Sequence, residues 1–272
     1  MSFPVILFLL LFTLAMLSLW FLPQREHSHW LSWCLFASAL SVCLLQGWLQ
    51  PFGLLWIGLL IIAAYLYGVF ETGWPHDFSL IVVMGLALAL AIHALPGFSV
   101  IPVFTDQAYR NLDKACVAFV LLALVTPRMA HWGELRIAFS MTWQFFLIAP
   151  LVLFSFVWWL GGIDMPRFSS LQYFWLWAWG NLLVTCVAEE LFFRGLVQHT
   201  LAIKWRDKRF GWFAAICLAS LLFGLAHIGG GLSFVLLATV AGLFYGAVYH
   251  LSRRIEIAIL LHFFINLLYG VF

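Results

Sequence analysis

Three ionisable side chains lie within one and a half helical turns of each other in a long apolar segment. Glu189, Glu190 and Arg194 belong to a run, from about residue 171 to 203, that is otherwise largely apolar. Burying an ionised group in a bilayer costs at least about 2 to 3 kcal/mol, so such groups usually have a function. Glu190 and Arg194 are four residues apart, which predicts an ion pair on one helix face. Glu189 points about 100° away from Glu190 and is suited to accept and return a proton.

Two later apolar segments add polar side chains of the kind used in hydrolysis. One contains the pattern Phe223-x-x-x-His227, and the other places His262 four residues before Asn266, on the same helix face. A lone histidine inside a membrane is more often a hydrogen-bonded packing residue than a catalytic group. Four polar groups from three helices nevertheless predict a single site, which also includes Glu189.

The elements that must position these side chains are membrane-spanning helices. The chain has 272 residues, of which 65% are hydrophobic and 9% are charged. Its apolar blocks of roughly 16 to 25 residues can cross a bilayer as helices, so we expect an all-α, polytopic membrane helical bundle. Barrel strands would alternate polar and apolar residues and are excluded. The diffuse net charge of +2 argues against a nucleic-acid partner, and the lipid bilayer is the expected surrounding.

The apolar blocks predict about ten transmembrane helices, or nine if the short fifth block does not span. They lie at about 3–22, 30–48, 52–70, 78–96, 114–126, 137–160, 171–203, 210–228, 232–251 and 255–271. The ninth contains Ala238, Gly242 and Gly246 at four-residue spacing, which predicts close helix packing without any further role.

The distribution of basic residues predicts the orientation in the membrane, because cytoplasmic loops are rich in Lys and Arg. Loops after odd-numbered spans contain Arg25, Arg128, Arg136, Lys204, Arg206, Lys208, Arg209, Arg253 and Arg254, whereas the alternate loops contain only Arg110, Lys114 and Arg167. Both termini are therefore expected on the non-cytoplasmic side. The polar residues after Glu190 further predict a water-filled funnel lined by Arg194, Gln198 or His199, with Glu189 at its floor.

The three motifs built on Glu189, His227 and His262, in this order and on separate helices, resemble those of a family of intramembrane proteases. This is the type II CAAX prenyl endopeptidase and bacteriocin-processing (CPBP, or Abi) family. The resemblance covers about residues 137–272, which we expect to form an intramembrane protease domain. Residues 1–136 are expected to add transmembrane helices of unassigned role.

The resemblance implies a division of labour among the site residues. Glu189 would be the general base, and His227 would help to bind and activate water. His262 and Asn266 would stabilise the oxyanion of the tetrahedral intermediate, with Glu190 and Arg194 holding the site together.

The resemblance leaves the question of metal open, because the family has been described both as metalloproteases and as metal-free glutamic proteases. Zinc bound by Glu189, His227 and His262 is the alternative. The chain has no H-E-x-x-H helix, and the carboxamide of Asn266 suits an oxyanion donor better than a zinc ligand. A glutamic mechanism without a cofactor is therefore favoured.

These observations predict an endopeptidase that acts on a membrane-associated protein or peptide. Buried Glu, His and Arg residues also occur in proton relays, so an ion-coupled transporter is an alternative. The chain shows no internal repeat and no matched pair of broken helices, as many transporters would. A non-catalytic membrane scaffold is the third hypothesis, although it would have no need of costly buried charges.

Overall fold

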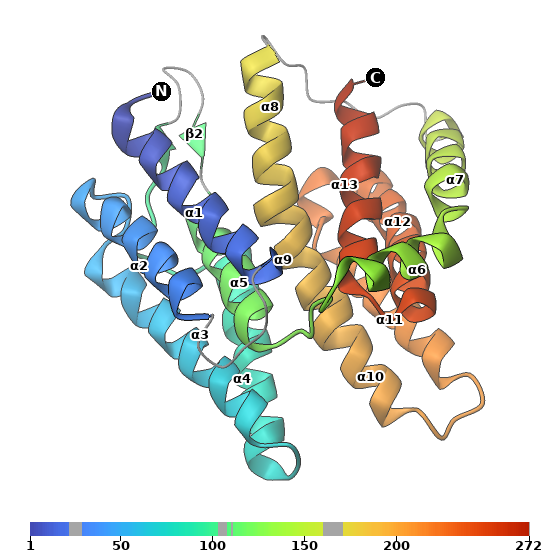
Figure 1. Cartoon of the computed structure of the whole chain (residues 1–272). Helices are drawn as coiled ribbons and strands as arrows, with labels where there is room; N and C mark the ends of the chain where they lie inside the picture. Colours follow the sequence, from blue (N-terminus) through green and yellow to red (C-terminus); the bar gives the residue numbers. More distant parts are fainter. Residues whose placement is uncertain (22–28, 103–107, 110, 160–170, 272) are drawn as a thin grey trace. The chain divides into compact units, whose positions relative to one another are not determined.

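The computed structural model describes residues 1–21, 29–102, 108–109, 111–159 and 171–271, and these form an all-α structure apart from one short pair of strands (Figure 1). The chain divides into two compact units. The first comprises residues 1–130 with 183–188, and the second comprises residues 131–182 with 189–272. Arg25, Arg110 and Arg167, which contribute to the predicted orientation, lie outside the described residues.

The first unit is built around a short buried helix. It contains α1 (Phe3–Phe21), α2 (His29–Leu45), α3 (Pro51–Val69), α4 (Trp74–Ala91), β1 (Ile101–Pro102), β2 (Ala108–Tyr109) and α5 (Leu112–Leu124). Helix α5 packs against α1, α3 and α4, and from Leu112 to Leu122 every residue except Lys114 is buried. Its length of about 20 Å is well below the roughly 30 Å of a hydrocarbon core. The fifth apolar block is therefore a core helix of this unit, which explains why it is apolar on all sides.

The second unit is organised around its longest regular α-helix, α12 (Leu232–Ser252). Around it lie α6 (Trp132–Thr142), α7 (Phe145–Trp159), α11 (Gly211–Leu225) and α13 (Ile255–Val271), all of which pack against α12. A 3₁₀ turn, η3 (Ile228–Gly230), joins α11 to α12. The buried side chains of these helices form one apolar core, to which Tyr245 and Leu261 belong.

One long helical segment, from Leu171 to Lys204, contains two π-helical stretches between its α-helical parts. It consists of α8 (Leu171–Gly180), the π-helix η1 (Asn181–Cys186), α9 (Val187–Glu190), the π-helix η2 (Leu191–Gln198) and α10 (His199–Lys204). Glu189 and Glu190 thus occupy a single α-helical turn between two π-helical stretches. π-Helical stretches are rare in proteins as a whole, and those that occur often lie at functional sites.

The helices confirm the class of membrane protein but not the number of spans. Each of the ten apolar blocks forms helix, yet only five described helices are long and apolar enough to cross a membrane, or six if the bent pair α6–α7 is one span. The sixth block is not one straight helix, because α6 and α7 meet at an angle of 51°. Three further apolar helices, at 30–45, 211–225 and 255–270, have at most 17 residues.

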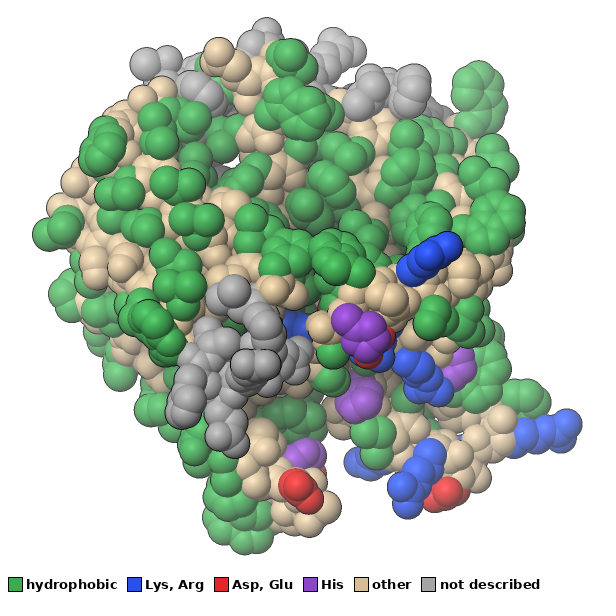
Figure 2. Space-filling model, viewed as in Figure 1, with side chains coloured by type: hydrophobic (Ala, Val, Ile, Leu, Met, Phe, Trp, Pro, Cys, Tyr) green, Lys and Arg blue, Asp and Glu red, His purple; other side chains and the backbone are tan. Residues whose placement is uncertain are grey.

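The surface is largely apolar, as expected for a chain with few charged residues. Figure 2 shows hydrophobic side chains over most of the visible face, and basic side chains gather where α10 ends and α11 begins. Lys204, Arg206, Lys208 and Arg209 are exposed there. Exposed apolar side chains elsewhere, such as Leu151 and Trp158, suit contact with lipid.

Candidate active site

The predicted pair of Glu190 and Arg194 is present and fully buried. Arg194 Nε lies 3.1 Å from Glu190 Oε2, and both side chains have no exposed surface. Arg194 Nη2 also donates a hydrogen bond of 3.1 Å to the backbone carbonyl of Gly242 on α12. The guanidinium carbon lies 4.8 Å from the ring centre of Phe223 and 5.5 Å from that of Tyr245. The charge is thus compensated by a carboxylate, a carbonyl and two aromatic faces.

Glu190 has a second partner that the sequence reading missed. Its Oε1 lies 2.8 Å from Nδ1 of His262 on α13. A carboxylate only accepts hydrogen bonds, so Nδ1 carries the proton and donates it. Glu190 therefore connects Arg194 to His262 and directs the other ring nitrogen of His262, Nε2, towards the neighbouring glutamate.

Glu189 faces two histidine nitrogens. Its Oε2 lies 3.9 Å from Nε2 of His262 and 3.9 Å from Nε2 of His227. The side chains of Glu189, His227 and His262 are 11%, 25% and 5% exposed, so the space between them is largely enclosed. Atoms about 4 Å apart can share hydrogen bonds with one water molecule. The structure thus brings three of the four predicted chemical groups to one point.

His227 is oriented by its own helix end. His227 lies two residues after Leu225, where α11 ends. Its Nδ1 lies 2.8 Å from the carbonyl oxygen of Phe223. A carbonyl can only accept, so this nitrogen donates, and in the neutral imidazole Nε2 is left as an acceptor facing Glu189. The four-residue spacing of the Phe223-x-x-x-His227 motif corresponds to this hydrogen bond.

Asn266 is placed by a residue that the sequence reading did not single out. Its Nδ2 donates a hydrogen bond of 3.1 Å to Oδ1 of Asn181, at the start of η1. It lies one helical turn after His262 on α13, as the spacing predicted. Asn181 lies eight residues before Glu189 in the same helical segment, and its polarity within an apolar run was the available signal.

The small residues of α12 do more than permit packing. The carbonyls of Gly242 and Gly246, one turn apart, accept hydrogen bonds from Arg194 and Gln198, which are also one turn apart. A Cβ atom at position 246 would lie 2.8 Å from Gln198 Oε1. Glycine therefore allows the close approach that these bonds require.

The structure separates the three residues that could line the predicted funnel. Arg194 is fully buried, and Gln198 is 3% exposed and bonded to α12, so neither lines an open passage. Both polar side chains are satisfied by α12 and have no need of water. His199 is exposed, and the funnel stays a prediction with this residue as its candidate lining.

Glu189, His227 and His262 are side chains of the types that bind zinc. Two imidazole nitrogens and a carboxylate have suitable chemistry for zinc, but ligand atoms in a tetrahedral zinc site are only about 3.4 Å apart. The corresponding nitrogen–oxygen distances here are both 3.9 Å. Across the described part of the chain, no three His, Cys, Asp or Glu side chains are placed to hold a metal ion. These two distances are longer than those of a tetrahedral zinc site, and no step proposed below uses a metal.

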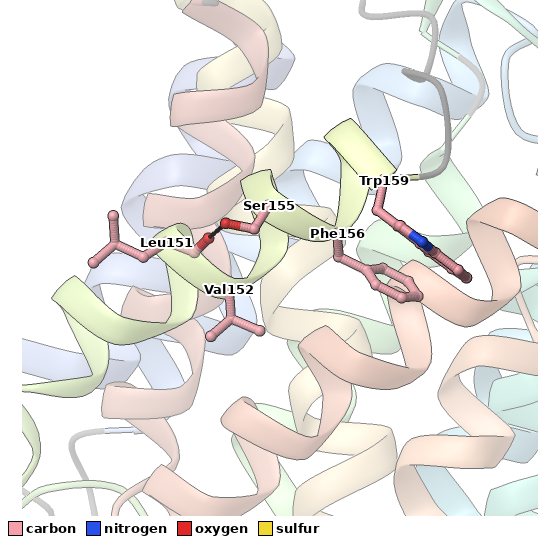
Figure 3. Close-up of a pocket in the computed structure, with 5 residues that line it drawn as sticks. All are labelled: Leu151, Val152, Ser155, Phe156 and Trp159. Atoms are coloured by element: carbon pink, nitrogen blue, oxygen red, sulfur yellow. Dashed lines mark hydrogen bonds between the residues drawn. The ribbon is translucent and has the colours of Figure 1, made fainter.

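A separate apolar pocket lies on α7 and contains none of these residues. It is lined by Leu151, Val152, Ser155, Phe156 and Trp159 (Figure 3). Its one hydroxyl, Ser155 Oγ, donates to the carbonyl of Leu151 at 2.7 Å. Four apolar side chains and an already bonded hydroxyl offer no catalytic chemistry.

Comparison with known proteins supports the assignment of the family. Residues 171–268 match the family model "Type II CAAX prenyl endopeptidase Rce1-like". Searches of curated proteins and of solved structures found no match. The matched segment contains the whole cluster from Asn181 to Asn266. Residues 171–268 are therefore similar to the Rce1-like type II CAAX prenyl endopeptidases, and this similarity supports an intramembrane CAAX-type endopeptidase.

Proposed function

We propose that the chain hydrolyses a peptide bond in a membrane-associated protein or peptide, by a glutamic mechanism at the cluster of Glu189, His227, His262 and Asn266. The observation that carries the proposal is the position of Glu189 Oε2, 3.9 Å from Nε2 of both histidines. This spacing provides room for one water molecule next to a carboxylate base.

Water activation follows from the hydrogen-bonding capacities of the two acceptors. His227 donates through Nδ1 to a backbone carbonyl, so its neutral Nε2 can accept one proton of the water in a hydrogen bond. Glu189 accepts the other and removes it as the water oxygen attacks the substrate carbonyl carbon. Glu189 then returns this proton to the leaving amine nitrogen when the carbon–nitrogen bond breaks. One water is consumed, and a carboxylic acid and an amine are released; the acid then gives its proton to solvent and becomes a carboxylate.

Oxyanion stabilisation is assigned to His262 and Asn266. Nδ1 of His262 already donates to Glu190, so donation from Nε2 as well requires the imidazolium form. The carboxylates of Glu189 and Glu190 with Arg194 alone have a net charge of −1, and an imidazolium at His262 makes the cluster neutral. The amide of Asn266, which donates a hydrogen bond to Asn181, is the second donor group assigned to the oxyanion. These donors support stabilisation of the developing negative charge.

We propose that residues 137–272 form the protease domain, because α6 and α7 pack against α12 and α13 within the same unit. The family name suggests a substrate with a prenylated CAAX C-terminus, which would reach the site from the lipid. Residues 1–136 contribute further apolar helices, and no chemistry is assigned to them.

The test uses purified full-length protein and a quenched fluorogenic peptide that ends in a farnesylated CAAX sequence. We expect cleavage by the wild type and at least a 10³-fold loss in Glu189→Gln, since the base is removed while the shape is kept. Glu71→Gln, at an exposed carboxylate of the first unit, is the control and should be fully active. Equal rates for wild type and Glu189→Gln would disprove the assignment of the base.

A further inference from the structure

The ring of His262 is covered on one face by an aromatic side chain from α12. The rings of Tyr245 and His262 are stacked, with centroids 4.6 Å apart and planes inclined by 15°. Tyr245 is 1% exposed and His262 is 4% exposed. The contact joins α12 to α13 at the point where the polar cluster meets the apolar core.

Ring stacking restrains the χ2 torsion of His262, which the hydrogen bond to Glu190 alone does not fix. Rotation about χ2 of histidine has broad energy wells, so the bond from Nδ1 to Glu190 still permits the ring to tilt. The Tyr245 face defines the ring plane, and Phe223 adds an edge-to-face contact at 5.7 Å and 87°. With the plane and Nδ1 both held, Nε2 has one direction available, towards Glu189.

The same tyrosine also contacts the other partner of Glu190. Its ring centre lies 5.5 Å from the guanidinium carbon of Arg194. Tyr245 thus borders both groups that bond to Glu190, namely Arg194 and His262. A residue used only to fill the core would not need a flat ring parallel to an imidazole.

We infer that Tyr245 is a positioning residue for the proposed hydrolysis, acting through His262 by ring stacking rather than by touching the substrate. The inference rests on the proposed function, because it assigns a role in the reaction of Glu189 and His262. Neither the Glu-Glu-x-x-x-Arg, Phe-x-x-x-His nor His-x-x-x-Asn motif includes this position.

The first experiment compares ring-keeping and ring-removing variants on the farnesylated CAAX peptide. Tyr245→Phe keeps the stacked ring and should remain within about threefold of wild-type kcat. Tyr245→Leu loses the ring, and we expect a fall in kcat of about 10- to 100-fold with KM nearly unchanged, because displacement of a reacting group affects the chemical step. Tyr249→Leu, one turn further along α12, is the matched control and should retain kcat. If Tyr245→Phe is as slow as Tyr245→Leu, or if Tyr245→Leu changes only KM, the stacking role is wrong.

A double-mutant cycle with His262→Ala separates positioning from general packing. If Tyr245 acts through His262, adding Tyr245→Leu to His262→Ala should lower kcat no further. A further tenfold fall would show a role independent of His262 and would overturn the inference. Should Tyr245→Leu yield no folded protein, Tyr245→Met removes the ring but supplies a longer, more adaptable side chain, and the same outcomes apply.

Failure of the proposed function would be seen separately. Full activity of Glu189→Gln would reject the catalytic assignment whatever the Tyr245 variants do. An inactive Glu189→Gln together with full activity in Tyr245→Leu would reject only the positioning role.

Discussion

The buried pair of Glu190 and Arg194 allows a quantitative prediction. Arg194→Met keeps an unbranched apolar stem but removes the guanidinium group and its charge. It deletes the 3.1 Å contact with Glu190 and the bond to the carbonyl of Gly242, and it leaves a carboxylate with no exposed surface. Breaking a buried ion pair from one side costs about 3–5 kcal/mol. Because His262 still contacts Glu190 at 2.8 Å, we expect the lower end, about 3 kcal/mol.

This loss should be visible in thermal unfolding. For a chain of this size, 1 kcal/mol corresponds to roughly 2–4 °C, so Arg194→Met should unfold about 6–12 °C below the wild type in the same detergent. The control is Arg206→Met, whose side chain is 76% exposed and pairs loosely with Asp207 at 3.8 Å. An exposed pair of this kind contributes about 0–1 kcal/mol, so the control should shift by no more than about 4 °C.

A double variant separates stability from activity. Glu190→Gln combined with Arg194→Met removes both charges and still offers His262 an amide oxygen as acceptor. We expect most of the lost thermal stability to return, while peptide cleavage stays at least about 100-fold below the wild type, because the carboxylate that accepts the hydrogen bond of His262 Nδ1 is replaced by a neutral amide. The reasoning is refuted if Arg194→Met unfolds at the same temperature as Arg206→Met and cleaves the peptide at the wild-type rate.

Four further expectations follow from the same structure. Exhaustive chelation should leave most of the peptidase activity, and purified protein should lack stoichiometric zinc; complete loss that zinc alone reverses would establish a metal mechanism. Asn266→Leu should lower kcat by roughly 10²–10³-fold with little change in KM, whereas a change confined to KM would argue against oxyanion stabilisation. Gly246→Ala should destabilise the protein by about 1–3 kcal/mol, because its Cβ would lie 2.8 Å from Gln198 Oε1; at Gly58, where a Cβ would meet nothing within 4 Å, the same change should be nearly neutral. A cysteine at position 207 should react with an impermeant reagent only after the cells are opened, since the adjoining basic cluster predicts a cytoplasmic loop, and labelling of intact cells would reverse the orientation.

Properties that depend on composition or on neighbours along one helix could be predicted from the sequence. A chain that is 65% hydrophobic and 9% charged has to place its surface in lipid, so the helical membrane class follows without a structure. The pair of Glu190 and Arg194 follows as well, since a four-residue spacing on a helix brings two side chains together whatever surrounds them. By contrast, length and hydropathy do not by themselves fix the number of spans, because the same apolar composition describes a core helix such as α5 and a helix that faces lipid.

The partners of the site residues were decided by tertiary packing. Glu190 and His262 are 72 residues apart in sequence, and Asn181 and Asn266 are 85 residues apart. No periodicity within one helix can indicate which helices become neighbours, or at what height along their axes they meet. Backbone carbonyls such as those of Gly242 and Gly246 are present in every helix, and these two became acceptors because α12 packs against the charged segment, closely enough at Gly246 that a Cβ would lie 2.8 Å from Gln198 Oε1. The sequence by itself therefore determined which groups are available for chemistry, and the packing of α11, α12 and α13 against one charged turn decided how those groups face each other.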